Sequence, residues 1–226
     1  MKRKTIIALV IISVLVIDQL LKFYIKLNIP YRDGFNILGL DWARILFIEN
    51  KGMAFGLEFG GVIGKYALSI FRIFMVGFLF YIINGMVKAK ERKGVIICFS
   101  LIIAGAIGNI IDSMFYGMIF SESHHTGQMA TLFPEGGGYA GFLQGRVVDM
   151  FYFPMVDTIL PDWVPIWGGK PFLFFRPVFN VADSAISVGV AMILLFYTDL
   201  FKDKKKETTE QTDDSADLPD THLEQA

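Results

Sequence analysis

The stretch Phe179-Asn180-Val181-Ala182-Asp183 opens an apolar run that continues to position 201. A second aspartate closes Arg146-Val147-Val148-Asp149 and leads directly into the apolar Met150-Phe151-Tyr152-Phe153. An ionisable group close to hydrocarbon is costly, and function is the usual reason for keeping one. The two aspartates therefore predict a membrane protein with an acid/base site.

The composition also indicates the membrane class. Hydrophobic residues fill 54% of the 226 positions, and the mean hydropathy of +0.50 exceeds what soluble domains usually reach. No basic block with interleaved aromatic residues predicts nucleic-acid binding. Cys98 is the only cysteine, so no disulfide can form within the chain.

Four apolar segments are candidates for crossing a bilayer: 5–26, 62–87, 94–115 and 179–201. Each has roughly 20 residues or more, close to what a hydrocarbon core of about 30 Å requires of a helix. They lack the alternation of a membrane β-barrel. The predicted fold is an integral membrane all-α bundle of four transmembrane helices. The first segment follows a basic start like that of a signal peptide, but no small-residue cleavage site follows it, so a retained helix is preferred.

Lysine and arginine residues predict the orientation. They cluster at 2–4, 88–93 and 202–206, which all lie on one side of a four-helix protein, and that side is expected to be cytoplasmic. Both termini are then cytoplasmic, and the connections 28–61 and 116–178 lie outside. The first connection is predicted to be a small strand-rich periplasmic unit. Residues 1–201 form the membrane domain, and the polar, acidic tail 202–226 is predicted to be disordered.

Four acids gather at the outer face in this topology, beside three asparagines. The acids are Asp18, Asp112, Asp149 and Asp183, and the asparagines are Asn50, Asn109 and Asn180. A single acid of this kind is most simply an interfacial carboxylate or a helix cap, but four on one face favour a polar site. Two carboxylates that share a site do not easily both ionise, so one can act as base and the other as acid. Because Asn180 is a good N-cap residue type, Asp183 is expected in the first turn of a helix, where the dipole favours its anion.

Five motifs occur in a particular order along the chain. They are Asp18-Gln19-Leu20-Leu21-Lys22, Asn50-Lys51-Gly52-Met53-Ala54-Phe55-Gly56, Gly105-Ala106-Ile107-Gly108-Asn109-Ile110-Ile111-Asp112, Val147-Val148-Asp149 and Phe179-Asn180-Val181-Ala182-Asp183-Ser184. Together they resemble bacterial lipoprotein signal peptidase, the type II signal peptidase, over roughly 18–187.

The resemblance implies an aspartic endopeptidase of the bacterial inner membrane. The family removes the signal peptide of diacylglyceryl-modified prolipoproteins just before the lipidated cysteine, needs no cofactor or metal, and is inhibited by globomycin. It implies that Asp149 and Asp183 are the catalytic pair. The supporting or substrate-binding positions would be Asp18, Lys22, Asn50, Gly52, Asn109, Asp112, Arg146 and Asn180.

The chain departs from the family pattern in two places. Ser113 stands where the family usually has arginine, a role that Arg146 or Arg72 would have to fill. Arg72 could instead be an arginine that snorkels to the interface. An insert, 118–144, separates the third and fourth motifs, and its Gly136-Gly137-Gly138 run predicts a hinged flap over the substrate entrance, with a loop resting on the membrane as the alternative. The adjacent His124 and His125 are a poor metal signature.

A transporter is the rival class. A small proton-coupled transporter could use the same acids as a relay, although transporters tend to have internal repeats and acids nearer the membrane midplane. No repeat is evident here, and the acids lie at one end of their segments. The peptidase is therefore the preferred hypothesis.

Overall fold

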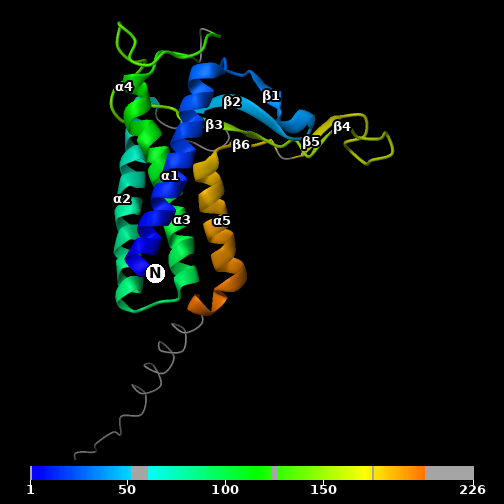
Figure 1. Cartoon of the computed structure of the whole chain (residues 1–226). Coiled ribbons are helices and arrows are strands. Elements are labelled where there is room, and N and C mark those ends of the chain that lie inside the picture. Colours follow the sequence, from blue (N-terminus) through cyan, green and yellow to red (C-terminus); the bar gives the residue numbers. More distant parts are fainter. Residues whose placement is uncertain (1, 52–60, 124–126, 175, 202–226) are drawn as a thin grey trace, which may run out of the picture.

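The computed structural model describes residues 2–51, 61–123, 127–174 and 176–201. Four helices lie side by side: α1 (Arg3–Asn28), α2 (Gly61–Lys88), α3 (Lys93–Ile111) and α5 (Val181–Phe196). A sheet crosses one end of this bundle (Figure 1), which we call the sheet end. The first residues of α1 and the 3-10 turn η4 (Thr198–Phe201) lie at the opposite end. The predicted tail 202–226 lies outside the described residues.

The main sheet has the strand order β1-β2-β3-β6 and is antiparallel throughout. Its strands are β1 (Gly34–Asn36), β2 (Arg44–Asn50), β3 (Val147–Tyr152) and β6 (Val178–Phe179), and the short helical turn η1 (Ile37–Gly39) follows β1. A hairpin of β4 (Val156–Ile159) and β5 (Pro171–Phe174) forms a second sheet. The strand-rich unit predicted in 28–61 is thus present, but it is completed by strands from the second connection.

The helices differ in length. Within the part of the chain that the structure describes, three apolar helices are long enough to cross a membrane: α1, α2 and the continuous run Lys93–Ile119. This run consists of α3, a π-helical turn η3 (Asp112–Tyr116) and α4 (Gly117–Ile119). α5 is apolar but has only 16 residues, fewer than the predicted 179–201. It begins after its N-cap Asn180 and ends where Tyr197 leaves helical geometry.

Helix α3 is the centre of the bundle and packs against α1, α2 and α5. Glycines let α5 come close. A Cβ on Gly105 would lie 2.1 Å from the backbone oxygen of Ala182, and one on Gly189 would lie 2.7 Å from that of Cys98. The close α3–α5 contact therefore requires glycine, which has no side chain, at both positions.

The insert 118–144 packs on the sheet end of the bundle. Within its described part, Ala130 N–H donates to the Lys26 carbonyl and Tyr139 N–H to the Phe120 carbonyl, and Phe120 is fully buried. A Cβ on Gly138 would lie 2.1 Å from the Gly117 oxygen, so this glycine permits close packing. The described residues of the insert thus pack on the bundle, and the flap over the substrate entrance stays a prediction.

The helix–helix packing can be tested with two glycines. Gly105→Ala should lower the free energy of unfolding by about 1–3 kcal/mol, because its methyl group collides with α5 backbone. Gly85→Ala is the matched control, since nothing lies within 4 Å of its Cβ, and it should be neutral or stabilising. Reaction of a thiol dye with buried Cys98 during heating in detergent reports unfolding. Equal melting temperatures for the two variants would contradict the packing argument.

Candidate active site

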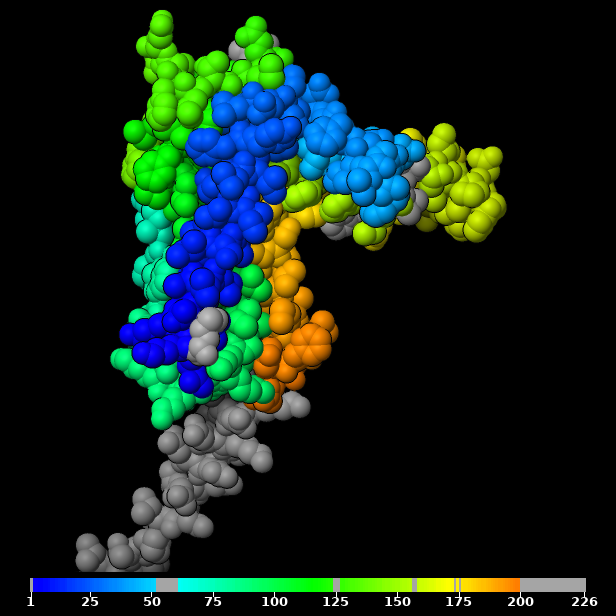
Figure 2. Space-filling model, viewed as in Figure 1, coloured from blue at the N-terminus to red at the C-terminus, as the bar shows by residue number. Residues whose placement is uncertain are grey.

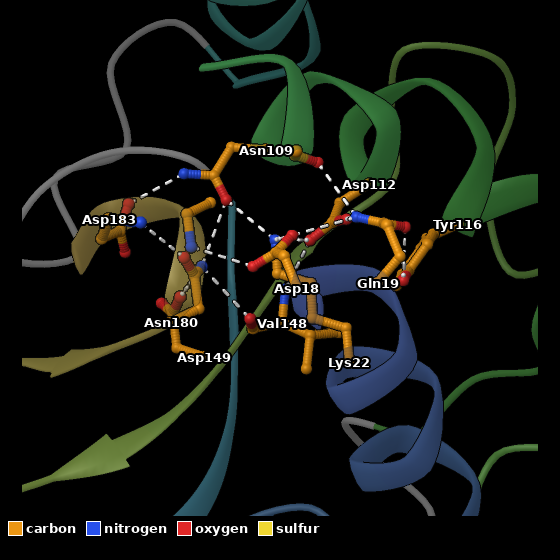
Figure 3. Close-up of polar contacts among 12 residues, drawn as sticks. Asp18, Gln19, Lys22, Asn109, Asp112, Tyr116, Val148, Asp149, Asn180 and Asp183 are labelled. Atoms are coloured by element: carbon orange, nitrogen blue, oxygen red, sulfur yellow. Dashed lines mark hydrogen bonds and ion pairs between the residues drawn. The ribbon is translucent and has the colours of Figure 1, made fainter. Parts of the chain in front are cut away.

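A buried lysine lies at the centre of the polar cluster at the sheet end (Figure 3). The Lys22 Nζ is 2.9 Å from Asp18 Oδ2 and 2.9 Å from Asp112 Oδ2, and all three side chains are fully buried. The same nitrogen donates to Asn109 Oδ1 at 3.0 Å. One ammonium therefore uses its three donors on two carboxylates and one amide.

The two carboxylates connect α1 and η3 to the elements that carry the other aspartates. Asp18 Oδ1 accepts the Ala182 N–H at 2.9 Å, a donor in the first turn of α5 that the helix itself leaves free. Asp112 Oδ2 accepts the Val148 N–H at 3.2 Å. The lysine–carboxylate cluster therefore holds both α5 and β3 in place.

Gln19 closes this cluster on its α3 side. Its Nε2 donates to Asp112 Oδ1 at 2.9 Å and to Asp18 Oδ2 at 3.1 Å, and its Oε1 accepts the Tyr116 hydroxyl at 3.0 Å. Asp112 and Tyr116 begin and end the π-helical turn, a geometry that often occurs at functional sites. Sequence reasoning placed Gln19 in a motif but did not assign it or Tyr116 to the site.

Lys22 also fixes the orientation of the Asn109 amide. Lysine has no acceptor, so Asn109 presents its oxygen to Lys22, and its Nδ2 then donates to Asp183 Oδ1 at 2.8 Å. A flipped amide would direct N–H groups at the ammonium and an oxygen at the carboxylate. The charge on Lys22 thus aims a hydrogen-bond donor at Asp183.

Asn180 contacts both of the predicted catalytic residues. As the N-cap of α5, its Oδ1 accepts the Asp183 N–H at 2.9 Å. Its Nδ2 therefore points the other way and donates to Asp149 Oδ1 at 2.7 Å, to the Val148 carbonyl at 3.3 Å and to Asn109 Oδ1 at 3.1 Å. One buried amide thereby joins the two aspartates.

The two aspartates differ in surroundings. The carboxyl of Asp149 on β3 is deeply buried, and Asn50 at the end of β2 also hydrogen-bonds it. Burial first, and then the negative charge of Asp183, raise the pKa of Asp149 to about 8. Asp183 lies in the first turn of α5, where the helix dipole favours a negative charge. At neutral pH the burial of Asp149 therefore favours its protonated form.

Arg146 and Arg72 were the two arginines considered for the role of the family arginine. Arg146 does not take the place of the family arginine beside Asp112, because its guanidinium binds Glu122 at 2.5 Å and Glu49 at 2.9 Å. Arg72 on α2 is half-buried and lies within electrostatic range of Asp183, Asp149 and Asp112. The partner interpretation of Arg72 therefore stays a prediction.

Ser113 occupies the position where the family usually has arginine. Ser113 is buried, and its hydroxyl donates to the Asn109 carbonyl at 3.0 Å. The cation that contacts Asp112 is Lys22. Asp112 is thus paired with a lysine from α1, and Ser113 contributes no charge.

A second charged network lies beyond the first, toward the insert. Lys26 Nζ contacts Glu49, which also binds Arg146, and donates to Ser123 Oγ at 3.1 Å. Lys26 and Glu49 were not predicted as site residues. The available signal was the spacing Asp18, Lys22, Lys26, since a step of four places residues on one helix face.

Most of the predicted site residues belong to one hydrogen-bonded network. Asp18, Lys22, Asn50, Asn109, Asp112, Asn180 and the two aspartates join one network, whereas Arg146 belongs to the second. Gly52, His124 and His125 lie outside the described residues. Over the described ranges no cluster of histidine, cysteine, aspartate or glutamate could hold a metal, and every buried side-chain nitrogen and oxygen there has a hydrogen-bond partner.

Comparison with known sequences gives a consistent result. The profile of the signal peptidase (SPase) II family matches residues 10–199. The chain is 47% identical over 216 residues to a lipoprotein signal peptidase of Porphyromonas gingivalis, covering 94% of this chain and 92% of the relative. A lipoprotein signal peptidase of Amoebophilus asiaticus is 37% identical over 203 residues, covering 88% and 80%.

Comparison with solved structures identifies the same architecture. A bacterial membrane enzyme solved by the in meso method superposes with a TM-score of 0.52 at 22% identity, covering 88% of this chain and 90% of the other. At that identity the likeness shows the fold alone. It agrees with a membrane protein of several apolar helices capped by a small sheet.

The central lysine can be tested through stability. Lys22→Met should destabilise the protein by about 3–5 kcal/mol, because it leaves two buried carboxylates without their cation. Lys4→Met is the control, since Lys4 lies exposed on the same helix, and it should change stability by less than about 0.5 kcal/mol. Thermal unfolding in detergent measures both. If Lys22→Met melted with the control, the cluster would not hold the elements together.

Proposed function

The chain belongs to the signal peptidase II family of aspartic peptidases, and we propose that it cleaves prolipoproteins with Asp149 and Asp183 as its catalytic pair. The bond cut would be the one just before the diacylglyceryl-modified cysteine. The observation that carries the proposal is the Asn180 side chain, which hydrogen-bonds the Asp149 carboxyl and the Asp183 backbone at once. The alternative of a proton-coupled transporter is not supported by these relatives.

The different surroundings of the two aspartates supply an acid and a base. Asp183, ionised, takes a proton from a water molecule bound between the pair, and the water oxygen attacks the scissile carbonyl carbon. Asp149, protonated, gives its proton to the carbonyl oxygen, so that a neutral gem-diol forms. The raised pKa of Asp149 supports its assignment as the acid.

The second half of the reaction returns both protons. Asp183 delivers the proton it holds to the leaving amine as the C–N bond breaks. One hydroxyl of the gem-diol returns its proton to Asp149, and a carboxylic acid results. The pair thereby ends in its starting state, and neither a metal nor a cofactor is required by this sequence of steps.

The amides beside the pair keep the two carboxyl groups oriented. Asn109 donates to Asp183 and Asn180 donates to Asp149, so each carboxyl has one oxygen held by a neutral donor. Asn50 lies at the end of β2 and adds a second bond to Asp149. We assign Asp18, Lys22, Asp112 and these asparagines as supporting residues, with Gly52 and Arg146 as further supporting positions from the family pattern.

The proposed topology puts the site on the outer side of the bacterial inner membrane. The bundle end opposite the sheet carries Arg3, Lys88 and Arg92, and Arg3 bonds the loop carbonyls of Lys90 and Glu91 there. Lysine and arginine mark the cytoplasmic side. Four crossings, with α5 as the fourth, would then leave both chain ends cytoplasmic and the connections 28–61 and 116–178 outside.

The partners proposed for this chain follow from its family. The substrate is the helical signal peptide of a diacylglyceryl-modified prolipoprotein, which reaches the site from the lipid and must unwind locally, because a peptide bond within a helix is shielded. A globomycin-type cyclic peptide would inhibit by occupying this place.

Neutral substitutions test the pair. Asp149→Asn and Asp183→Asn should each lower turnover of a lipidated prolipoprotein by about 10²–10⁴-fold, since an amide neither accepts nor gives the required proton. The double variant should lose little more, because the pair acts as a unit. Asp199→Asn, at the far end of the bundle, is the control and should be fully active. Near-normal turnover by either single variant of the pair would refute the assignment.

The raised pKa of Asp149 predicts how activity and stability depend on pH. Because Asp149 must be protonated to act, kcat/KM should fall as pH rises through about 8. The folded pKa lies above the value of about 3.9 for a free aspartate, so the folded chain keeps a proton that the unfolded chain releases. Asp149 therefore costs stability increasingly as pH rises from about 4 to about 8. Asp149→Asn should be inactive yet melt higher than the parent at pH 8. A lower melting temperature would contradict the burial argument.

A further inference from the structure

The β4–β5 hairpin and its loop extend sideways from the sheet end, beyond α5 (Figure 2). We call residues 155–174 the arm. The arm begins next to a packed aromatic group at the edge of the main sheet. There the Phe153 ring lies 5.6 Å from that of Phe179 and 6.3 Å from those of Phe151 and Trp42. The base of the arm is thus fixed to the same sheet that carries Asp149.

The tip of the arm, residues 160–170, is folded, yet it is apolar on the outside. Backbone hydrogen bonds join Leu160 with Lys170 and Gly169, and a Cβ on Gly168 would lie 2.6 Å from the Asp162 oxygen. The largest apolar side chains of the tip nevertheless point outward. Trp163 is 81% exposed, Ile166 85% and Trp167 56%.

Ile166 also has a left-handed backbone conformation, with φ of 71°. A β-branched residue is a true outlier in that region, and an exposed side chain gains no internal packing to offset the strain. A loop that is ordered but displays its apolar groups is typical of an interaction surface.

The position of the arm relative to α5 indicates the partner. α5 has 16 residues, so it spans about 24 Å, less than the hydrocarbon core of about 30 Å. Its first residue follows β6 by only two positions. The apolar layer around α5 must therefore reach the level of β6, from which the arm extends. The arm tip extends from the sheet end, where α5 begins, and α5 runs from there to the opposite end with an exposed apolar surface that includes Val188, Leu194 and Leu195.

We infer that the arm tip is a lipid-binding element that inserts Trp163, Ile166 and Trp167 into the interfacial layer of the bilayer beside α5. Tryptophan has an apolar body and one N–H donor, which suits the boundary between headgroups and acyl chains. Lys170 at the end of the tip is exposed and can face the phosphates. The inserted tip would hold the main sheet at the surface where α5 is too short to cross an unperturbed bilayer.

The three tryptophans of the chain make the inference testable in the full-length protein. Trp42→Phe/Trp167→Phe leaves Trp163 as the only indole, and Trp42→Phe/Trp163→Phe leaves Trp167. Each variant is reconstituted in phosphatidylcholine vesicles with and without bromine on the acyl chains. Acrylamide is the aqueous quencher, and N-acetyltryptophanamide in the same suspension is the reference for full exposure to water.

Both single-tryptophan proteins should lose roughly half or more of their fluorescence in brominated vesicles and should be protected from acrylamide. Quenching by acrylamide as strong as for the reference, without bromine quenching, would mean that the tip stands in water and would overturn the inference. Protection from both quenchers would mean that protein, such as a second copy of this chain, covers the tip, which would also overturn it. Cleavage activity enters none of these outcomes, so the result is independent of the proposed function.

Discussion

The buried Lys22 ammonium is the contact on which the site depends. It neutralises Asp18 and Asp112, and these two carboxylates bind backbone N–H groups at the start of α5 and in β3. Carboxylates in such a place could not stay charged without a cation. The lysine therefore lets four separate segments of the chain, α1, η3, β3 and α5, meet at one point. Lys22 also orients the side chains that bind Asp149 and Asp183, although no described contact joins it to either aspartate directly.

Lys22 also fixes which end of the Asn109 amide donates and which end accepts. Because it can only donate, Asn109 must accept from it and donate to Asp183. Asn180 is constrained from the other side by the N-cap bond and must donate toward Asp149. Two amides whose orientations are fixed independently thus give two carboxylates equivalent donors. What distinguishes Asp149 is its burial beside the negative charge of Asp183, which raises its pKa to about 8.

Much of this arrangement was predictable from residue types and spacing. Continuous apolar runs predicted the helices, and the positions of Asp18, Asp112 and Asp183 within them predicted a shared end. The length of α5 was overestimated, because hydropathy does not register that Tyr197 leaves helical geometry. The partner of Arg146 was also predicted wrongly, since Glu49 and Glu122 reach it only after the insert has folded back on α1. Contacts of that kind depend on tertiary packing that no local pattern contains.

The insert acts on the site through the strand register. Glu49 lies opposite Val148 in the β2–β3 ladder, and it is held by Lys26 on one side and Arg146 on the other. Arg146 in turn binds Glu122 of the insert. A shift of one residue between β2 and β3 would turn every side chain of β3 to the opposite face, and Asp149 would leave Asn180. The packed insert, through the Glu122–Arg146 ion pair, therefore stabilises the one register in which Asp149 and Asp183 share an amide.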